Sequence, residues 1–349
     1  MSKRKLSRQQ RWRIEKIQAE RARRAEQRDT RDTQKLATGE YGPEQNGRVI
    51  AHYGRTLDVQ ALTLSSTQAV RCHLRANLDG LVTGDRVIWR AANDDEGRVV
   101  AGVVVARSER QSVLERPDAR GQLKPVAANI DQILIVFAVE PVPHPNLIDR
   151  YLVAAEATGI APVLVLNKID LLPAGGGELR ALLDRYATLG YPVVATTTAC
   201  TEGLDALLAQ LSGRTSVFVG QSGVGKSSLI DRLLPDESLR IGELSEASRK
   251  GTHTTTTARL YQLPSADSAE LIDSPGIREF GLIHLSEQQV AEGFIEFRDH
   301  LGHCRFRDCR HRQEPGCALL EAVDRGDIHA ERFASYRHII DSLDAGNTT

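Results

Sequence analysis

The sequence contains no apolar run that approaches the length of a transmembrane helix, about 20 residues. Its N-terminus is too basic and too polar to be a secretory signal. Cysteine is scarce: of five in the chain, Cys72 and Cys200 are isolated, whereas Cys304, Cys309 and Cys317 lie close together. Such a cluster in a reducing compartment indicates metal binding and not disulfides. We therefore expect a cytoplasmic protein without membrane contacts, and its 349 residues allow two or three domains.

Charge is unevenly distributed along the chain. Residues 1–35 hold 13 Lys and Arg against 5 Asp and Glu, a local charge of +8, so the total of −1 leaves −9 for the remaining residues. The segment 3–35 also lacks Gly and Pro and has few large apolar residues, which favours a frayed helix or disorder over a packed domain. We interpret residues 1–40 as a basic arm that binds RNA phosphates, with Trp12 available to stack on a base. A solubilising tail would have the same composition.

Residues 41–112 predict a small β-barrel that begins with a linker at Tyr41, Gly42 and Pro43. Five short β-like runs alternate with turns, at residues 48–52, 57–59, 70–74, 86–89 and 99–105. Five strands at this spacing are typical of the OB fold, whose usual ligand is an oligonucleotide. Fold alone does not establish that ligand, and a purely structural domain remains an equal alternative.

Residues 113–280 predict an α/β domain. Apolar strands at 133–139, 162–166, 192–196 and 216–219 alternate with helices at 146–158, 178–189 and 204–211. Continuous apolar strands indicate a parallel sheet that is covered by helices on both faces. Such sheets bind ligands at the carboxyl ends of their strands.

The strongest motif is a phosphate-binding P-loop between the strand at 216–219 and a helix at 228–234. It consists of Gly220, Gln221, Ser222, Gly223, Val224, Gly225, Lys226, Ser227 and Ser228. Its glycines allow backbone N–H groups at a helix N-terminus to converge on phosphate oxygens. Lys226 would reach the β- and γ-phosphates, and the Ser227 hydroxyl would bind Mg²⁺. The chain is therefore expected to bind a nucleoside triphosphate.

A second motif, Asn167-Lys168-Ile169-Asp170, follows the strand at 162–166 and favours GTP over ATP. The Asp170 carboxylate can accept hydrogen bonds from the N1–H and N2 amino groups that adenine lacks. The Asn167 amide would meet O6 or N7, and the Lys168 stem would pack along the base. Thr198-Ala199, after the next strand, offers a backbone N–H for O6, although an ordinary turn would have the same residues.

The segment 250–257 predicts a switch loop in which one threonine among Thr254 to Thr257 binds Mg²⁺, with Thr255 as our candidate. Residues 271–276 then form a strand that ends in Asp-x-x-Gly. Asp273 would hold Mg²⁺ through water, and the Gly276 N–H would sense the γ-phosphate. The five parts of a GTPase site are therefore present in an unusual order, with guanine recognition ahead of the phosphate loop.

A third motif predicts a metal site within a C-terminal domain at 281–349. Cys304, Cys309, His311 and Cys317 supply the Cys₃His set of a tetrahedral structural Zn²⁺. Four arginines inside this segment should lower the pKa of the thiols and present cations to RNA phosphate: Arg305, Arg307, Arg310 and Arg312. Helices at about 286–301 and 317–343 are expected to frame the site, although unliganded cysteines on a loop would show the same spacing.

With these motifs in this order, the chain resembles the circularly permuted, ribosome-associated GTPases of the RsgA family over nearly its whole length apart from the first forty residues. The resemblance implies an N-terminal OB fold, a permuted GTPase domain and a C-terminal zinc domain. It further implies a bacterial GTPase, cycling between GTP and GDP, that acts in late maturation of the small (30S) ribosomal subunit with 16S rRNA and assembly factors as partners. Ser274 occupies a position where family members more often have Thr. We expect a monomer, because no feature of the sequence requires a larger assembly.

The chain lacks the glutamine that orients water in Ras-like enzymes, because Ile277 follows Asp-x-x-Gly. We therefore expect slow turnover unless the ribosome assists. Our hypothesis is that His253, once the ribosome orders its loop, positions the water and completes a catalytic set with Lys226 and Gly276; a solvated loop histidine is the alternative. The missing glutamine also favours a second interpretation, an RNA-binding assembly chaperone in which GTP is a structural ligand that is rarely hydrolysed.

Overall fold

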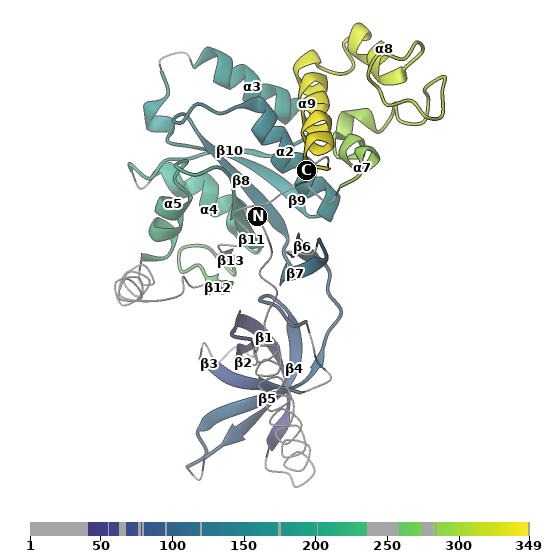
Figure 1. Ribbon diagram of the computed structural model, residues 1–349. Helices are drawn as coiled ribbons and strands as arrows, with labels where there is room; N and C mark the ends of the chain where they lie inside the picture. The colour runs from purple at the N-terminus through teal and green to yellow at the C-terminus, as the bar shows by residue number, and fades with distance from the viewer. Residues whose placement is uncertain are drawn as a thin grey trace, which may run out of the picture. The chain divides into compact units, whose positions relative to one another are not determined.

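The computed structural model describes residues 41–54, 56–62, 68–75, 78, 80–94, 96–118, 121–173, 176–200, 202–235, 258–273, 282 and 285–347. The chain divides into two compact units, residues 1–109 and 110–349 (Figure 1). The predicted basic arm and the predicted switch loop lie outside the described residues. Among the helices that are described, none is both long and apolar enough to span a bilayer.

The first unit contains a closed five-stranded barrel, as predicted from the spacing of its strands. The strands are β1 (Tyr41–His52), β2 (Thr56–Ala61), β3 (Ala69–Leu74), β4 (Arg86–Asn93) and β5 (Val99–Arg107). β1 pairs antiparallel with both β2 and β4, β2 pairs with β3, β4 pairs with β5, and a parallel pairing of β3 with β5 closes the barrel. Trp89 lies in the core of this barrel and is 2% exposed, and Gly47 and Gly102 make room for its indole ring.

The prediction of a linker at the start of this unit was wrong. Tyr41 is the first residue of β1 and lies opposite Ala92 of β4. The register of this pair shifts between Tyr41 and Glu44, so Pro43 lies at an irregularity, where a strand tolerates a residue without an N–H. Gly and Pro therefore mark a bulge here and not a boundary.

The second unit is built on a mixed sheet with the strand order β10-β9-β8-β11-β13-β12. Its strands are β8 (Gln132–Ala138), β9 (Ala161–Asn167), β10 (Val193–Ala195), β11 (Thr215–Val219), β12 (Arg259–Gln262) and β13 (Glu270–Asp273). Five strands are parallel, as expected, and β12 is antiparallel to β13. A separate hairpin, β6 (Val113–Pro117) and β7 (Leu123–Ala128), precedes the sheet and was not predicted.

Helices cover both faces of the sheet, which explains why β8 and β11 are buried along their whole length. The helices are α2 (Pro145–Thr158), α3 (Gly177–Thr188), α4 (Asp205–Leu211) and α5 (Lys226–Leu233), with short 3₁₀ turns η1 (Ile169–Leu171) and η2 (Glu202–Leu204). Leu134 and Val136 of β8 share a core with α4 and α5. Ile135 and Phe137 point to the opposite face, where they line a small cavity with residues of α2.

The C-terminal region consists of α7 (Glu287–Glu292), η3 (Ile295–Phe297), α8 (Ala318–Arg325) and α9 (Ala330–Asn347). The expected helix at 286–301 is therefore interrupted at Gly293, where an added Cβ would lie 2.8 Å from Val153 Cγ1 of α2. The expected helix at 317–343 is divided at Gly326, which has a left-handed φ of 84°. Val153 and Ala154 of α2 belong to the same core as these helices, and α9 runs alongside α2 (Figure 1).

Candidate functional site

The loop between β11 and α5 has the geometry of a phosphate-binding loop. Gly220 has a φ of 138°, and a Cβ there would lie 2.1 Å from the carbonyl oxygen of Val136. Gly225 has a φ of 92°, and its Cβ would lie 2.4 Å from Asn167 Nδ2. Because no side chain fits at either position, both glycines are required for the tight turn that brings the loop's N–H groups to the start of α5.

Side chains that could hold phosphate and metal gather at the carboxyl edge of the sheet. Lys226, the first residue of α5, donates from Nζ to the carbonyl oxygens of Gly220 and Gln221, each at 2.6 Å. Ser227 follows it in the first turn and is exposed. Asp273 ends β13, which is the parallel neighbour of β11. The P-loop and Asp273 therefore lie at the ends of adjacent strands.

The second motif reaches the same edge from β9 and is tied to the P-loop. Asn167 is 1% exposed and donates from Nδ2 to the carbonyl oxygen of Val224 at 2.9 Å. Lys168, in the left-handed region at φ 60°, donates from Nζ to the carbonyl oxygens of Glu140 (2.7 Å) and Gly223 (2.8 Å). In this geometry the Asn167 amide joins the loop after β9 to the P-loop.

Thr197 is a site residue that the sequence analysis missed. It is 5% exposed, its hydroxyl donates to Asp170 Oδ1, and the Ala199 N–H donates to the same hydroxyl at 3.1 Å. The Ala199 N–H, one of the predicted donors to guanine O6, is thus hydrogen-bonded within the loop. The run of three threonines at 196–198 was the available signal, because a threonine hydroxyl can donate a hydrogen bond to a nearby carboxylate.

Three predicted site residues, His253, Thr255 and Gly276, lie outside the described residues. The remaining predicted nucleotide-site residues lie at the ends of β9, β10, β11 and β13, in the loops that follow them or in the first turn of α5. The order of these strands along the chain differs from their order in the sheet, so segments far apart in sequence are brought to one edge.

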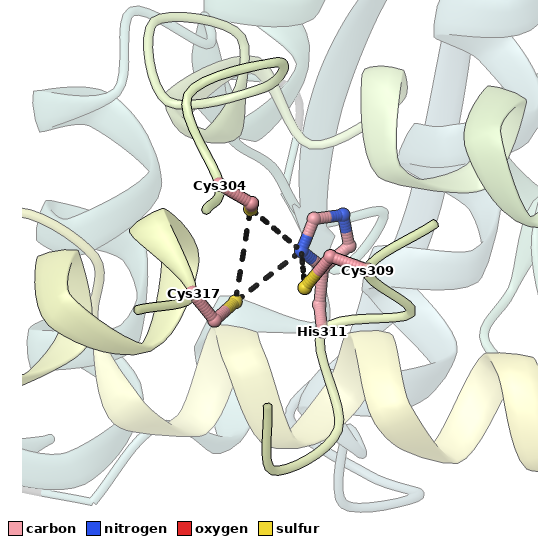
Figure 2. A group of neighbouring side chains, drawn as sticks. All are labelled: Cys304, Cys309, His311 and Cys317. Atoms are coloured by element: carbon pink, nitrogen blue, oxygen red, sulfur yellow. Dashed lines mark hydrogen bonds between the residues drawn. The ribbon is translucent and has the colours of Figure 1, made fainter. Parts of the chain in front are cut away.

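The four predicted metal ligands converge in the C-terminal region (Figure 2). His311 Nδ1 lies 3.5 Å from the sulfur of Cys304, 3.6 Å from that of Cys309 and 3.3 Å from that of Cys317. The sulfurs of Cys304 and Cys317 are 4.0 Å apart. Ligands bound at about 2.0–2.3 Å around a tetrahedral Zn²⁺ are separated by similar distances, so the donor set fits that ion.

Burial favours the uncharged forms of three of the four ligands when no cation is bound. Burial raises the pKa of the Cys309 thiol to about 12, and burial raises that of Cys317. Burial lowers the pKa of His311, which favours the neutral imidazole that a metal requires. Without a cation these buried thiols stay protonated, whereas a bound divalent ion would stabilise their thiolates.

The expectation that the neighbouring arginines lower the thiol pKa was wrong. Arg310 forms an ion pair with Glu287, and Arg312 donates to Asp344 at 2.7 Å. Arg305 lies over the ring of Phe306 at 5.5 Å. These three guanidinium groups have other partners, and burial is the main cause of the raised pKa of Cys309 and of Cys317.

Glu314 is a second residue that the sequence analysis missed. Its Oε1 accepts a hydrogen bond from the Arg310 N–H at 3.0 Å. Its Oε2 accepts from the Arg312 N–H at 2.7 Å and from the Gln313 N–H at 3.0 Å. The carboxylate therefore holds the turn that contains His311, whose φ of 58° is unusual for a residue other than glycine.

Comparisons with known proteins agree with this geometry. The family model of the RsgA GTPase matches residues 107–283. A "Small ribosomal subunit biogenesis GTPase RsgA" from Chromohalobacter salexigens is 74% identical over 98% of this chain and 99% of that protein. Its namesake from Azotobacter vinelandii is 59% identical over 98% of each chain.

Two solved structures are also similar. YjeQ from Thermotoga maritima matches with a TM-score of 0.69 and 30% identity over 86% of this chain and 99% of that one. YloQ, described as a circularly permuted GTPase, matches with a TM-score of 0.67 and 26% identity over 87% of this chain and 96% of that one.

Proposed function

The chain belongs to the RsgA GTPase family, and we propose on that basis that it binds the small (30S) ribosomal subunit, acts late in its maturation and hydrolyses GTP faster on that subunit. Its GTP hydrolase activity follows from the family. The observation that supports the proposal best is the meeting of the P-loop, the Asn167–Asp170 motif and Asp273 at one edge of the sheet.

Each group at this edge has a proposed role. Asp170, oriented by Thr197, accepts the two hydrogen bonds that guanine alone can donate. The N–H groups of the P-loop hold the phosphates, and Lys226 exchanges its two carbonyl partners for phosphate oxygens. Ser227, Thr255 and Asp273 hold the Mg²⁺ that accompanies GTP and neutralises charge on its phosphates.

Catalysis is proposed to depend on the partner. Ile277 occupies the position after Asp-x-x-Gly, and an aliphatic side chain cannot orient a water molecule. We assign that task to His253, with Gly276 sensing the γ-phosphate, and we assign ordering of the loop to the 30S subunit. Free enzyme would therefore turn over slowly.

The remaining parts of the chain are proposed to provide RNA contacts. The basic arm, the barrel and the C-terminal domain at 281–349 would contact 16S rRNA, and assembly factors would be further partners. Zn²⁺ bound by the Cys₃His cluster would be structural, because all four tetrahedral positions are filled by protein. Such a protein acts in the cytoplasm, and we expect a monomer.

A second function is favoured by the missing glutamine. In an RNA-binding assembly chaperone, GTP would stabilise the fold and would rarely be hydrolysed. We rank this interpretation second, because the chain belongs to a family of GTPases.

Phosphate release with and without purified 30S subunits separates the two functions. The proposal predicts slow release from the free protein and a large stimulation by 30S subunits, which His253→Ala abolishes while GTP binding is retained. The same assay with 50S subunits is the control for an effect of ribosomal RNA in general, and it should show no comparable stimulation. Equal rates with and without 30S subunits would favour the chaperone.

A further inference from the structure

Arg332 of α9 lies in a buried ionic cluster between the C-terminal helices and α2. Its side chain is 2% exposed, and those of Asp149 and Glu296 are 1% and 7% exposed. Arg332 Nη1 donates to Asp149 Oδ1 at 2.5 Å, while Nε and Nη2 donate to the two oxygens of Glu296 at 2.7 and 2.9 Å. One guanidinium therefore bridges a carboxylate on α2 and a carboxylate on η3.

A fourth element, α3, joins the same cluster. Tyr186 of α3 donates from its hydroxyl to Asp149 Oδ1 at 2.6 Å. The guanidinium carbon of Arg332 lies 4.5 Å from the ring centre of Phe294, in a cation–π arrangement. The orientation of Arg332 is therefore fixed by partners from both the sheet-covering helices and the C-terminal region.

Around the cluster, the interface is continuous. Val153 and Ala154 of α2 are buried in the core of the C-terminal region. At its rim, Arg298 pairs with Glu156 at 2.7 Å, and Arg150 donates to Ser342 Oγ at 2.8 Å. Because buried carboxylates are stable as ions only when they are paired, Arg332 holds α2 and the C-terminal helices in one relative position.

From α2 the contacts continue to the nucleotide site. The loop that leads into α2 carries Glu140, whose carbonyl oxygen accepts a hydrogen bond from Lys168 Nζ at 2.7 Å. The same Nζ donates to Gly223 of the P-loop at 2.8 Å. At the start of α2, His144 lines a small cavity together with the P-loop residue Gln221. The position of α2 thus sets the position of a loop that contacts both nucleotide-binding motifs.

We propose that Arg332 is a positioning residue for the guanine nucleotide site, acting through Asp149 and the loop before α2. The C-terminal metal-binding region is then a fixed part of the nucleotide-binding body. This inference rests on the proposed guanine site, and it predicts that loss of the guanidinium loosens the loop at Glu140 and with it the contacts of Lys168.

Titration of fluorescent GDP tests the proposal in a double-mutant cycle. Arg332→Met should raise the Kd about tenfold, within the five- to 150-fold range typical of coupled sites. In a Lys168→Met background the same change should add little, because the route through Lys168 is already broken. Arg337→Met is the matched control, since Arg337 is an exposed arginine on the same helix. Thermal melts and zinc content would show that each variant is folded and metal-loaded at the assay temperature.

A wild-type Kd in folded Arg332→Met, or effects of Arg332→Met and Lys168→Met that simply add, would overturn the proposal. If Arg332→Met does not fold, Arg332→Lys takes its place in the cycle, because a single ammonium cannot bridge both carboxylates with the geometry of a guanidinium. Absence of GDP binding by the wild-type protein would instead refute the guanine site itself, so the two failures are distinguishable.

Discussion

Replacing Glu314 with Gln should weaken zinc binding without touching a zinc ligand. The Glu314 carboxylate accepts hydrogen bonds from the backbone N–H groups of Arg310, Arg312 and Gln313, in the turn that contains His311. Gln has nearly the same shape but offers one oxygen and one NH₂ group. In its better orientation the oxygen keeps the bonds from Arg312 and Gln313, while the NH₂ group faces the N–H of Arg310 and that bond is lost.

The magnitude follows from these contacts. One lost hydrogen bond costs about 0.5–1.5 kcal/mol, and the two retained bonds lose the assistance of a charge. Because Glu314 is partly exposed, water screens part of this effect, and a total of about 1–2 kcal/mol is reasonable. Since 1.4 kcal/mol is tenfold in affinity, zinc should bind roughly tenfold more weakly, at the low end of effects of residues behind metal ligands.

Competition with a chromophoric chelator of known zinc affinity measures this change. Hydrogen bonds from its own N–H and from that of Arg310 lower the pKa of Glu314 to about 2, so the carboxylate is ionised throughout the working pH range. Glu321→Gln on α8, an exposed glutamate, is the control for loss of a charge near the site. If Glu314→Gln holds zinc as tightly as the wild type and Glu321→Gln, the turn does not depend on the carboxylate.

Further predictions concern the guanine loop, the metal and the barrel. Asp170→Asn should weaken GDP binding by about a hundredfold or more, because an NH₂ group then faces the donors of guanine; titration with fluorescent GDP checks this. In the same assay Thr197→Val should weaken binding about tenfold, and an unchanged Kd would show that the hydroxyl does not orient Asp170. Cys317→Ser should release zinc and lower the melting temperature, as metal analysis and calorimetry would reveal. Burial raises the pKa of Cys72 to about 12 from an unfolded value of 9.0, so its contribution to stability is complete below pH 9 and is lost as pH rises toward 12. Denaturant titrations should show that Cys72→Ala reduces this alkaline loss by up to about 1.4 kcal/mol per pH unit.

The features that sequence alone predicted are those encoded in short, contiguous segments. The residues of the P-loop are close together in sequence, as are those of Asn167–Asp170 and those of the Cys₃His set. Their spacing alone therefore predicts how they are arranged. The five barrel strands and the parallel sheet were predicted because their apolar periodicity is local. The structure confirms the fold class on these grounds.

The missed features depend on partners distant in sequence. Arg332 and Asp149 are 183 residues apart, and no local pattern connects them. The direction of the Cys309 pKa was predicted wrongly because the nearby arginines turn to acidic partners such as Glu287. Strand β12 is short, and its pairing with β13 could not be inferred from its own four residues.

The packing of α9 on α2 has a practical consequence for dissecting this protein. α2 follows the first strand of the sheet, and α9 lies near the carboxyl end of the chain. A fragment that stops before α9 would leave the side of α2 that packs against this helix facing water. Truncated GTPase modules should therefore precipitate or self-associate, and soluble expression requires that the last helix be retained.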